Sequence, residues 1–152
     1  MGGATPAIHD VELEFRRTLP APPERVFTAL TRAEHLARWL CDAAQSDPRE
    51  GGRIVLTWTR PGSSERPFAG SWVAFDPSRA CAFEGGQPGH PGGYAGHIDW
   101  ILEPDGGGSR LVTIHRMPPR MEYAPLAAVY ALAWPRALDR LVAYLTPKHP
   151  HP

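Results

Sequence analysis

The residues of this 152-residue sequence that could ligate a metal or transfer a proton are chiefly its seven histidines. His90 and His97 lie on either side of a Gly/Pro-rich segment, and Asp99 follows shortly after. Imidazole and carboxylate groups are common zinc ligands, but these three lack the close spacing of a pair such as HxxxH, so the sequence predicts no metal site. His115 lies in an alternating stretch whose inward face the sequence leaves open, and a structural role is favoured over contact with a ligand.

Serine, cysteine and paired acids give no better case for catalysis. No G-x-S-x-G pattern occurs, and Ser71 lies inside a predicted strand without a base that the sequence can identify. Cys41 and Cys81 form no CxxC pair and are expected to be two reduced thiols. Asp99 and Glu103 share one face of a predicted strand, and the hydrophobic pattern places that face outward. The sequence therefore favours a binding protein over an enzyme, and it predicts no cofactor.

Aromatic residues give the strongest functional signal. The sequence contains five tryptophans, and these lie on predicted elements that would surround one interior. Tryptophan and tyrosine combine a large apolar surface with one polar atom that can orient a ligand. These side chains either fill the core or partly line a binding site.

Composition and charge exclude several classes of partner. Sixteen basic and sixteen acidic residues give a net charge of zero, so long-range attraction to nucleic acid or to an anionic membrane is not expected. No apolar run approaches the roughly 20 residues that cross a bilayer, and the N-terminus lacks the features of a secretory signal. We expect a cytoplasmic protein with a flexible leader over residues 1–9, one domain over 10–146 and a flexible tail over 147–152.

The elements that must position these residues begin with a strand, because apolar and charged residues alternate from Val11 onward. Three prolines end this strand, and Pro23 with Glu24 is typical of a helix start. Thr31 and Glu34 fit a capping box, which predicts a second short helix.

Five further strands and one long helix follow. The strands are predicted over 53–60, 68–76, 80–84, 94–103 and 109–116, and the helix over 126–145. Pro135 predicts either a kink near Ala131 to Trp134 or a helix start at that point. Strands grouped between helices indicate an α+β fold with an antiparallel sheet.

Several motifs occur in a characteristic order along this chain. They are APPERVFTALT (21–31), Leu36 with Trp39, Gly51-Gly52, Gly70 with Val73, Asp76-Pro77 with Arg79, Leu102-Glu103-Pro104, Gly108-Ser109 with Leu111 and His115, and Trp134 with Leu138, Leu141 and Leu145. Together they resemble the START-like (SRPBCC, birch-pollen-allergen-like) helix-grip superfamily. Within it, the chain is similar to bacterial homologues of the C-terminal domain of the heat-shock protein 90 ATPase activator. Ala133 departs from this pattern, because the family has glycine before the tryptophan.

The resemblance implies a curved antiparallel sheet of about six strands wrapped on a long C-terminal helix, with two short helices after the first strand. It also implies a cavity between the sheet and the long helix that holds a small hydrophobic or aromatic molecule. The candidate cavity-lining residues are Phe27, Trp39, Trp58, Phe68, Trp72, Phe83, Tyr94, Trp100, His115, Tyr130 and Trp134.

Two other functions stay open. The family name suggests interaction with a heat-shock chaperone in the stress response, although the eukaryotic relatives also use an N-terminal domain for which this sequence has no room. Some superfamily members are enzymes that use the same cavity. A homodimer is compatible with the composition but is not required by it.

Overall fold

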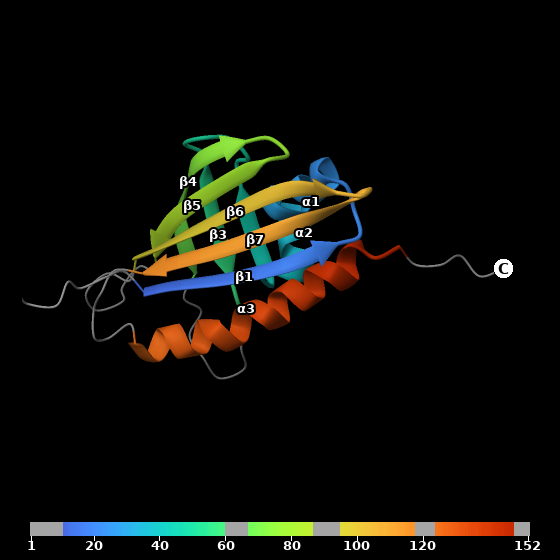
Figure 1. The fold of residues 1–152 in the computed structure, drawn as a ribbon. Coiled ribbons are helices and arrows are strands. Elements are labelled where there is room, and N and C mark those ends of the chain that lie inside the picture. Colours follow the sequence, from blue (N-terminus) through green and yellow to red (C-terminus); the bar gives the residue numbers. More distant parts are fainter. Residues whose placement is uncertain (1–10, 60–66, 87–94, 118–123, 148–152) are drawn as a thin grey trace, which may run out of the picture.

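The computed structural model describes residues 11–59, 67–86, 95–117 and 124–147. Along the chain the elements are β1 (Val11–Leu19), α1 (Pro23–Thr31), α2 (Ala33–Trp39), β2 (Ala43–Ser46), β3 (Arg53–Thr57), β4 (Phe68–Asp76), β5 (Ala80–Gly86), β6 (Ala95–Asp105), β7 (Gly108–Met117) and α3 (Ala124–Leu145) (Figure 1). The predicted leader, residues 1–9, lies outside the described residues, as does the predicted tail, 147–152, except for Pro147.

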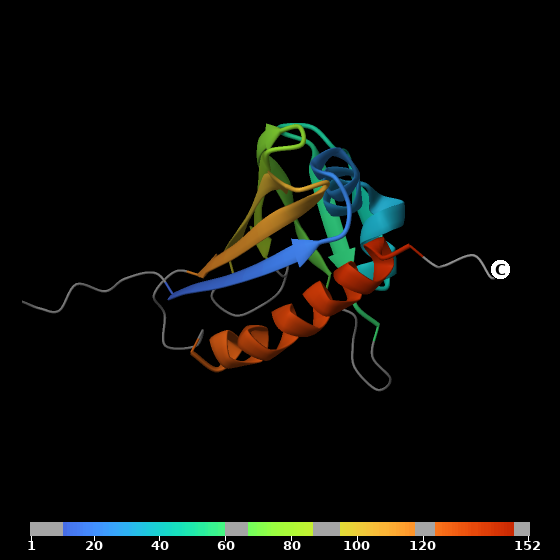
Figure 2. The ribbon, with the colours of Figure 1, turned by 45° about the vertical axis from the view of Figure 1, so that its right-hand side comes forward.

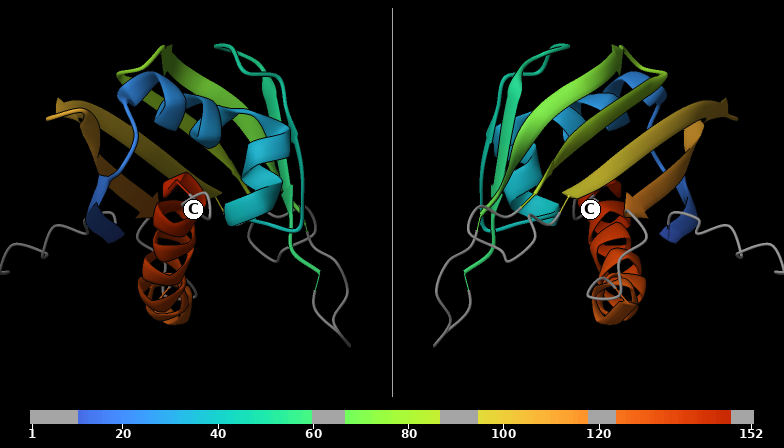
Figure 3. Two further views of the ribbon diagram at one scale, coloured as in Figure 1. Left: turned by 90° about the vertical axis from the view of Figure 1, so that its right-hand side faces the viewer. Right: turned by 90° about the vertical axis from the view of Figure 1, so that its left-hand side faces the viewer.

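The strands form one antiparallel sheet in the order β1-β7-β6-β5-β4-β3-β2. The α3 helix runs beneath the sheet alongside β1, and α1 and α2 lie at the end of the sheet where α3 ends (Figures 1 and 2). Views along α3 show the sheet bent around the side on which the helices lie (Figure 3). This arrangement confirms the predicted α+β helix-grip fold, with the core on the inner face of the sheet.

The sheet has seven strands, whereas the sequence predicts about six. The additional strand is β2, which reads AAQS and pairs with β3 at the edge of the sheet. None of its residues has a high intrinsic preference for strands, so its pairing depends on the neighbouring β3 and not on its own sequence. The predicted number of strands is therefore one too low.

The predicted alternation along β1 is confirmed. Val11, Leu13 and Phe15 are half-buried and face α3, whereas Glu12 and Glu14 are exposed on the outer face. A period of two residues places alternate side chains on opposite faces of a strand. This alternation gives the inner face of the sheet edge an apolar surface.

The two short helices confirm the predicted start of α1 but not the capping box. Pro22 is the N-cap, and Pro23 begins the helix with Glu24 in its first turn. Thr31 is the last residue of α1, and its hydroxyl donates to the Phe27 carbonyl 2.8 Å away. Because this hydroxyl bonds backward along α1, it does not cap α2, which begins after Arg32 without a side-chain cap.

The α3 helix is continuous from Ala124 to Leu145, so the alternative that a helix begins near Ala131 to Trp134 is wrong. Pro135 lies inside it. Proline leaves the carbonyl four residues earlier without its usual helical partner and crowds the preceding turn. It therefore divides the helix into an N-terminal and a C-terminal half.

A close approach of two backbones makes Gly70 the most sensitive glycine of the sheet. Gly70 of β4 pairs with Gly85 of β5, and a Cβ on Gly70 would overlap the carbonyl oxygen of Glu84. We expect Gly70→Ala to lower the free energy of unfolding by roughly 2–3 kcal/mol in urea denaturation, because the strands must separate to admit the methyl group. Ala74→Ser, at an exposed position of the same strand, should change it by less than about 0.5 kcal/mol. Equal stability of the two variants would contradict this account.

Candidate ligand-binding site

A buried cluster of aromatic rings occupies the inner face of the sheet, with Trp100 of β6 at its centre. The ring centroid of Trp100 lies 5.3 Å from that of Phe83, 5.9 Å from Trp39 and 6.5 Å from Trp72. From α3, Trp134 meets Trp100 edge-on at 6.2 Å. Aromatic side chains from two strands and two helices therefore pack against the indole ring of Trp100, which is 0% exposed.

His115 of β7 lies on the same face and is 2% exposed. Its Nδ1 accepts a hydrogen bond of 2.9 Å from Nε1 of Trp134, and its ring centroid lies 4.6 Å from that of Tyr130. Because Nδ1 is the acceptor, the neutral ring carries its proton on Nε2. Burial, with a smaller effect from nearby His97, lowers the pKa of His115 from 6.5 to about 4. At pH 7 the imidazole is therefore neutral and offers no positive charge to a ligand.

Among the described residues of this face, two buried polar atoms lack hydrogen-bond partners: Trp100 Nε1 and Thr113 Oγ1. Both residues are 0% exposed, and they are directly opposite each other in the β6–β7 ladder. The other four indole N–H groups of the chain all donate to a described partner. A buried polar group without a partner costs roughly 1–3 kcal/mol, so such a pair calls for an explanation.

The α3 helix covers this face of the sheet unevenly, because its C-terminal half is packed more tightly against the core than its N-terminal half. After Pro135, the inward residues Ala137, Leu138, Leu141 and Leu145 are all buried. Between 128 and 133 every residue except the half-buried Tyr130 is exposed.

From residue 127 to 134, the N-terminal half of α3 packs against the core through Ala127, Tyr130 and Trp134. Beneath it, Leu13 and Phe15 of β1 are only partly buried, and they pair with His115 and Thr113 respectively. A partly covered apolar surface therefore leads from the edge of the sheet to the two unpartnered polar atoms.

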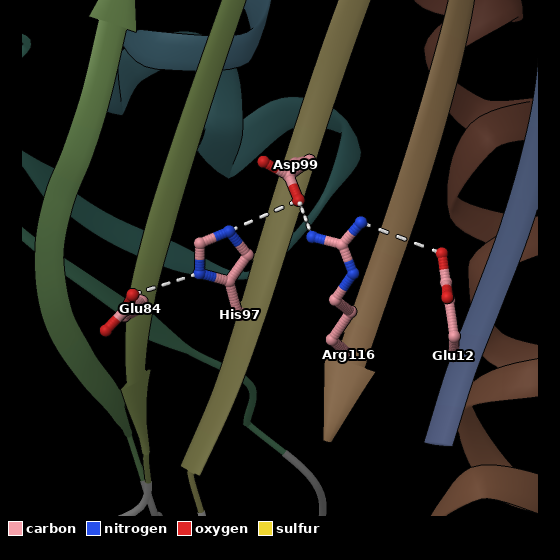
Figure 4. Close-up of polar contacts among 5 residues, drawn as sticks. All are labelled: Glu12, Glu84, His97, Asp99 and Arg116. Carbon is pink, nitrogen blue, oxygen red and sulfur yellow. Dashed lines mark hydrogen bonds and ion pairs between the residues drawn. The ribbon is translucent and has the colours of Figure 1, made fainter. Parts of the chain in front are cut away.

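The outer face of the sheet carries a chain of polar and charged side chains instead. His97 lies between two carboxylates, with Nδ1 3.1 Å from Glu84 and Nε2 3.2 Å from Asp99 (Figure 4). Arg116 continues the chain, 2.9 Å from Asp99 and 3.7 Å from Glu12. This chain ties together the four strands β5, β6, β7 and β1, and it gives His97 and Asp99 a structural role.

The outer face also has a groove of about 320 Å³. It is lined in part by Arg16, Arg17 and Arg110. Each of these guanidinium groups lies 3.1–3.6 Å from a carboxylate, so the groove has little net positive charge with which to hold an anion.

Metal binding and thiol chemistry receive no support from the described part of the chain. It contains no group of three His, Cys, Asp or Glu side chains that are placed to hold one metal ion, and His90 lies outside it. Both cysteines are buried and free. Burial raises the pKa of the Cys41 thiol to about 11 and raises that of Cys81 further, so neither thiol is activated.

Comparison with known proteins places the chain in a family. Residues 20–146 match the family described as "Activator of Hsp90 ATPase homolog 1-like protein". The chain belongs to this family. It is thus a START-like, helix-grip member, as its sequence motifs predict. No curated protein matches the chain in sequence.

Solved structures of bacterial proteins share the fold of this family member. Protein CV1439 from Chromobacterium violaceum has a TM-score of 0.79 and 22% identity, over 90% of this chain and 98% of that one. Protein MLL2253 from Mesorhizobium loti has a TM-score of 0.77 and 17% identity, over 89% and 96%. A Rhodobacter sphaeroides protein has a TM-score of 0.75 and 26% identity, over 88% and 91%.

In this family member, most of the predicted site residues lie on the inner face. Seven of the predicted residues lie in or beside the aromatic cluster. At its centre are Trp39, Trp72, Phe83, Trp100 and Trp134, and His115 and Tyr130 lie beside it.

The other candidates lie further away. Phe68 contacts Phe83 at 5.6 Å, and Phe27 contacts Phe75 at 5.0 Å. Trp58 is 37% exposed just beyond β3, and its indole donates to the Leu40 carbonyl. Tyr94 lies outside the described residues.

Sequence reasoning missed Thr113. The signal that could have found it is a hydroxyl residue between Leu111 and His115 on one face of a strand. Once the inward face is known, a polar residue amid apolar neighbours is conspicuous. The structure settles that face, because Leu111, Thr113 and His115 are all buried toward α3.

None of the described helices is both long and apolar enough to cross a membrane.

Proposed function

We propose that this protein binds a small, mainly aromatic or hydrophobic molecule between the inner face of the sheet and the N-terminal half of α3. The observation that carries the proposal is the partly covered apolar surface of Leu13 and Phe15, which continues into the buried cluster around Trp100. Binding sites for small molecules are typically apolar and aromatic, with a few polar atoms that orient the ligand. The inner face has this composition.

The entry route follows from the way α3 is attached. The C-terminal half is held by buried leucines, whereas between residues 127 and 134 the helix packs against the core through Ala127, Tyr130 and Trp134. Pro135 weakens the helical hydrogen bonding between the halves. A small outward movement of the N-terminal half would admit a ligand over Leu13 without disturbing the rest of the core.

The test uses isopropylbenzene as an apolar aromatic probe. We expect saturable binding, seen as an increase in Tm and a change in tryptophan fluorescence. Leu13→Trp should weaken binding at least tenfold, because the larger ring fills the entrance. Val129→Trp adds the same ring on the solvent side of α3, where Val129 is 52% exposed, and should bind as the wild type does.

Two results would refute the proposed function. One is the absence of saturable binding up to the solubility limit of the probe. The other is unchanged binding in Leu13→Trp, provided that its far-ultraviolet circular dichroism matches that of the wild type.

Stimulation of a heat-shock chaperone ATPase is the second candidate. The family description favours it, and the exposed Val129 and Leu132 of α3 offer an apolar surface to a protein partner. The test measures the ATPase rate of the host chaperone with increasing amounts of this protein. A rate increase that Leu132→Ser reduces would support this function, and an unchanged rate would refute it.

A further inference from the structure

We propose that Trp100 and Thr113 anchor the polar end of the ligand, and that they select a neutral molecule with a hydrogen-bond-acceptor oxygen, such as an aryl ketone. This inference rests on the proposed function and specifies the chemical class of its ligand. It is carried by the two unpartnered atoms, Trp100 Nε1 and Thr113 Oγ1.

The two atoms differ from the other polar groups of the core. The buried hydroxyls of Thr31 and Ser109 donate to the backbone carbonyls of Phe27 and Ala21, and the His115 ring accepts from Trp134. Among the described residues, Trp100 Nε1 and Thr113 Oγ1 are the buried side-chain nitrogen and oxygen atoms that have no hydrogen-bond partner, and their residues are a cross-strand pair.

The pair can donate two hydrogen bonds to one ligand. An indole N–H is a donor only, and a threonine hydroxyl can donate as well as accept. Side chains directly opposite each other on antiparallel strands project side by side from the same face. A carbonyl oxygen has two lone pairs and can accept from both donors at once. Binding such an oxygen would satisfy both atoms and remove the cost that they impose on the ligand-free fold.

The surroundings of the pair disfavour a charged ligand. Thr113 is flanked by Phe15 of β1 and by Trp100, and Trp100 is surrounded by aromatic rings. Two titratable side chains lie beside them: His115, which is neutral at pH 7, and Cys81, opposite Trp100 in β5, whose thiol pKa is raised by burial so that it too stays neutral. A carboxylate transferred from water to this position would lose its hydration without gaining a cation, at a cost of several kcal/mol. A neutral ketone avoids this penalty.

Three probes of nearly equal size and shape separate these contributions: acetophenone, isopropylbenzene and benzoate. Isothermal titration calorimetry should give acetophenone a Kd about tenfold lower than that of isopropylbenzene, because one net hydrogen bond changes an affinity by about this factor. Benzoate should bind at least tenfold more weakly than acetophenone. Equal affinities for acetophenone and isopropylbenzene, or tightest binding of benzoate, would overturn the inference.

Variants of the pair test which atoms provide the preference. Thr113→Val keeps the side-chain shape and removes the hydroxyl, and Trp100→Phe removes the indole N–H. Each should reduce the preference for acetophenone over isopropylbenzene to about threefold or less. Thr113→Val should also leave the Tm of the ligand-free protein unchanged or higher, because it removes a buried unsatisfied group. The matched control is Thr18→Val, at an exposed position of the neighbouring β1, which should keep the full preference.

The outcomes separate this inference from the function on which it rests. If isopropylbenzene binds but acetophenone has no advantage, the site exists and the inference is wrong. If the advantage persists in both variants, other atoms select the ligand and the inference is wrong. If no probe binds, the proposed function fails and the inference fails with it.

Discussion

Lowering the pH from 7 to 4 is expected to remove about 3 kcal/mol of stability through His115 alone. In the fold, burial lowers the pKa of His115 to about 4, against 6.5 for an unperturbed histidine. Between these values the unfolded chain binds a proton that the folded chain does not, so the free energy of unfolding falls as the pH falls. The contribution is complete above about pH 6.5 and is lost as the pH approaches 4, and the size follows from the difference between the two values.

Urea denaturation at a series of pH values measures this effect. Carboxylates also titrate at the acid end, so the informative quantity is the difference between the wild type and His115→Gln. That difference should fall by about 3 kcal/mol between pH 7 and pH 4. A Trp134→Phe variant should show a smaller loss, because Nδ1 of His115 is then no longer held as an acceptor. Parallel pH profiles for the wild type and His115→Gln would contradict the assignment of a buried neutral imidazole.

The second large effect is expected for Trp100→Ala, which should lower the free energy of unfolding by about 3–5 kcal/mol. Trp100 is fully buried, and its ring contacts Trp39, Trp72, Phe83 and Trp134. Truncation would remove apolar burial and leave a cavity that rigid neighbouring rings cannot fill. Chemical denaturation followed by circular dichroism measures the change.

Trp58→Ala is the matched control for this substitution. Trp58 is 37% exposed beyond the end of β3 and makes one hydrogen bond, to the Leu40 carbonyl. Its truncation should cost less than about 2 kcal/mol. If Trp100→Ala were no more destabilising than Trp58→Ala, the cluster around Trp100 would not be the centre of the core.

Much of the fold can be read from the sequence because its signals are local. The alternation from Val11 fixes the orientation of β1, and Pro23 with Glu24 fixes the start of α1. Where a tertiary contact decides the structure, the sequence misleads. β2 exists because β3 pairs with it, and the Thr31 hydroxyl bonds within α1 instead of capping α2.

The site is less predictable than the fold. The sequence identifies most of the aromatic residues, but it cannot say that Trp100 and Thr113 are opposite each other, because this depends on the register of β6 and β7. It also cannot reveal which indole lacks a partner. The alternation around His115 was equally compatible with either face, and only its packing against Trp134 and Tyr130 decides it.

The most direct test of ligand binding under α3 follows the five indole N–H signals of the 15N-labelled protein during titration with isopropylbenzene. Single Trp→Phe substitutions assign the signals. If the ligand binds on the inner face, the signals of Trp100 and Trp134 should shift saturably, while that of the distant Trp58 stays in place. A shift confined to Trp58, or no saturable shift of Trp100 in a folded sample, would contradict a binding site between the sheet and α3.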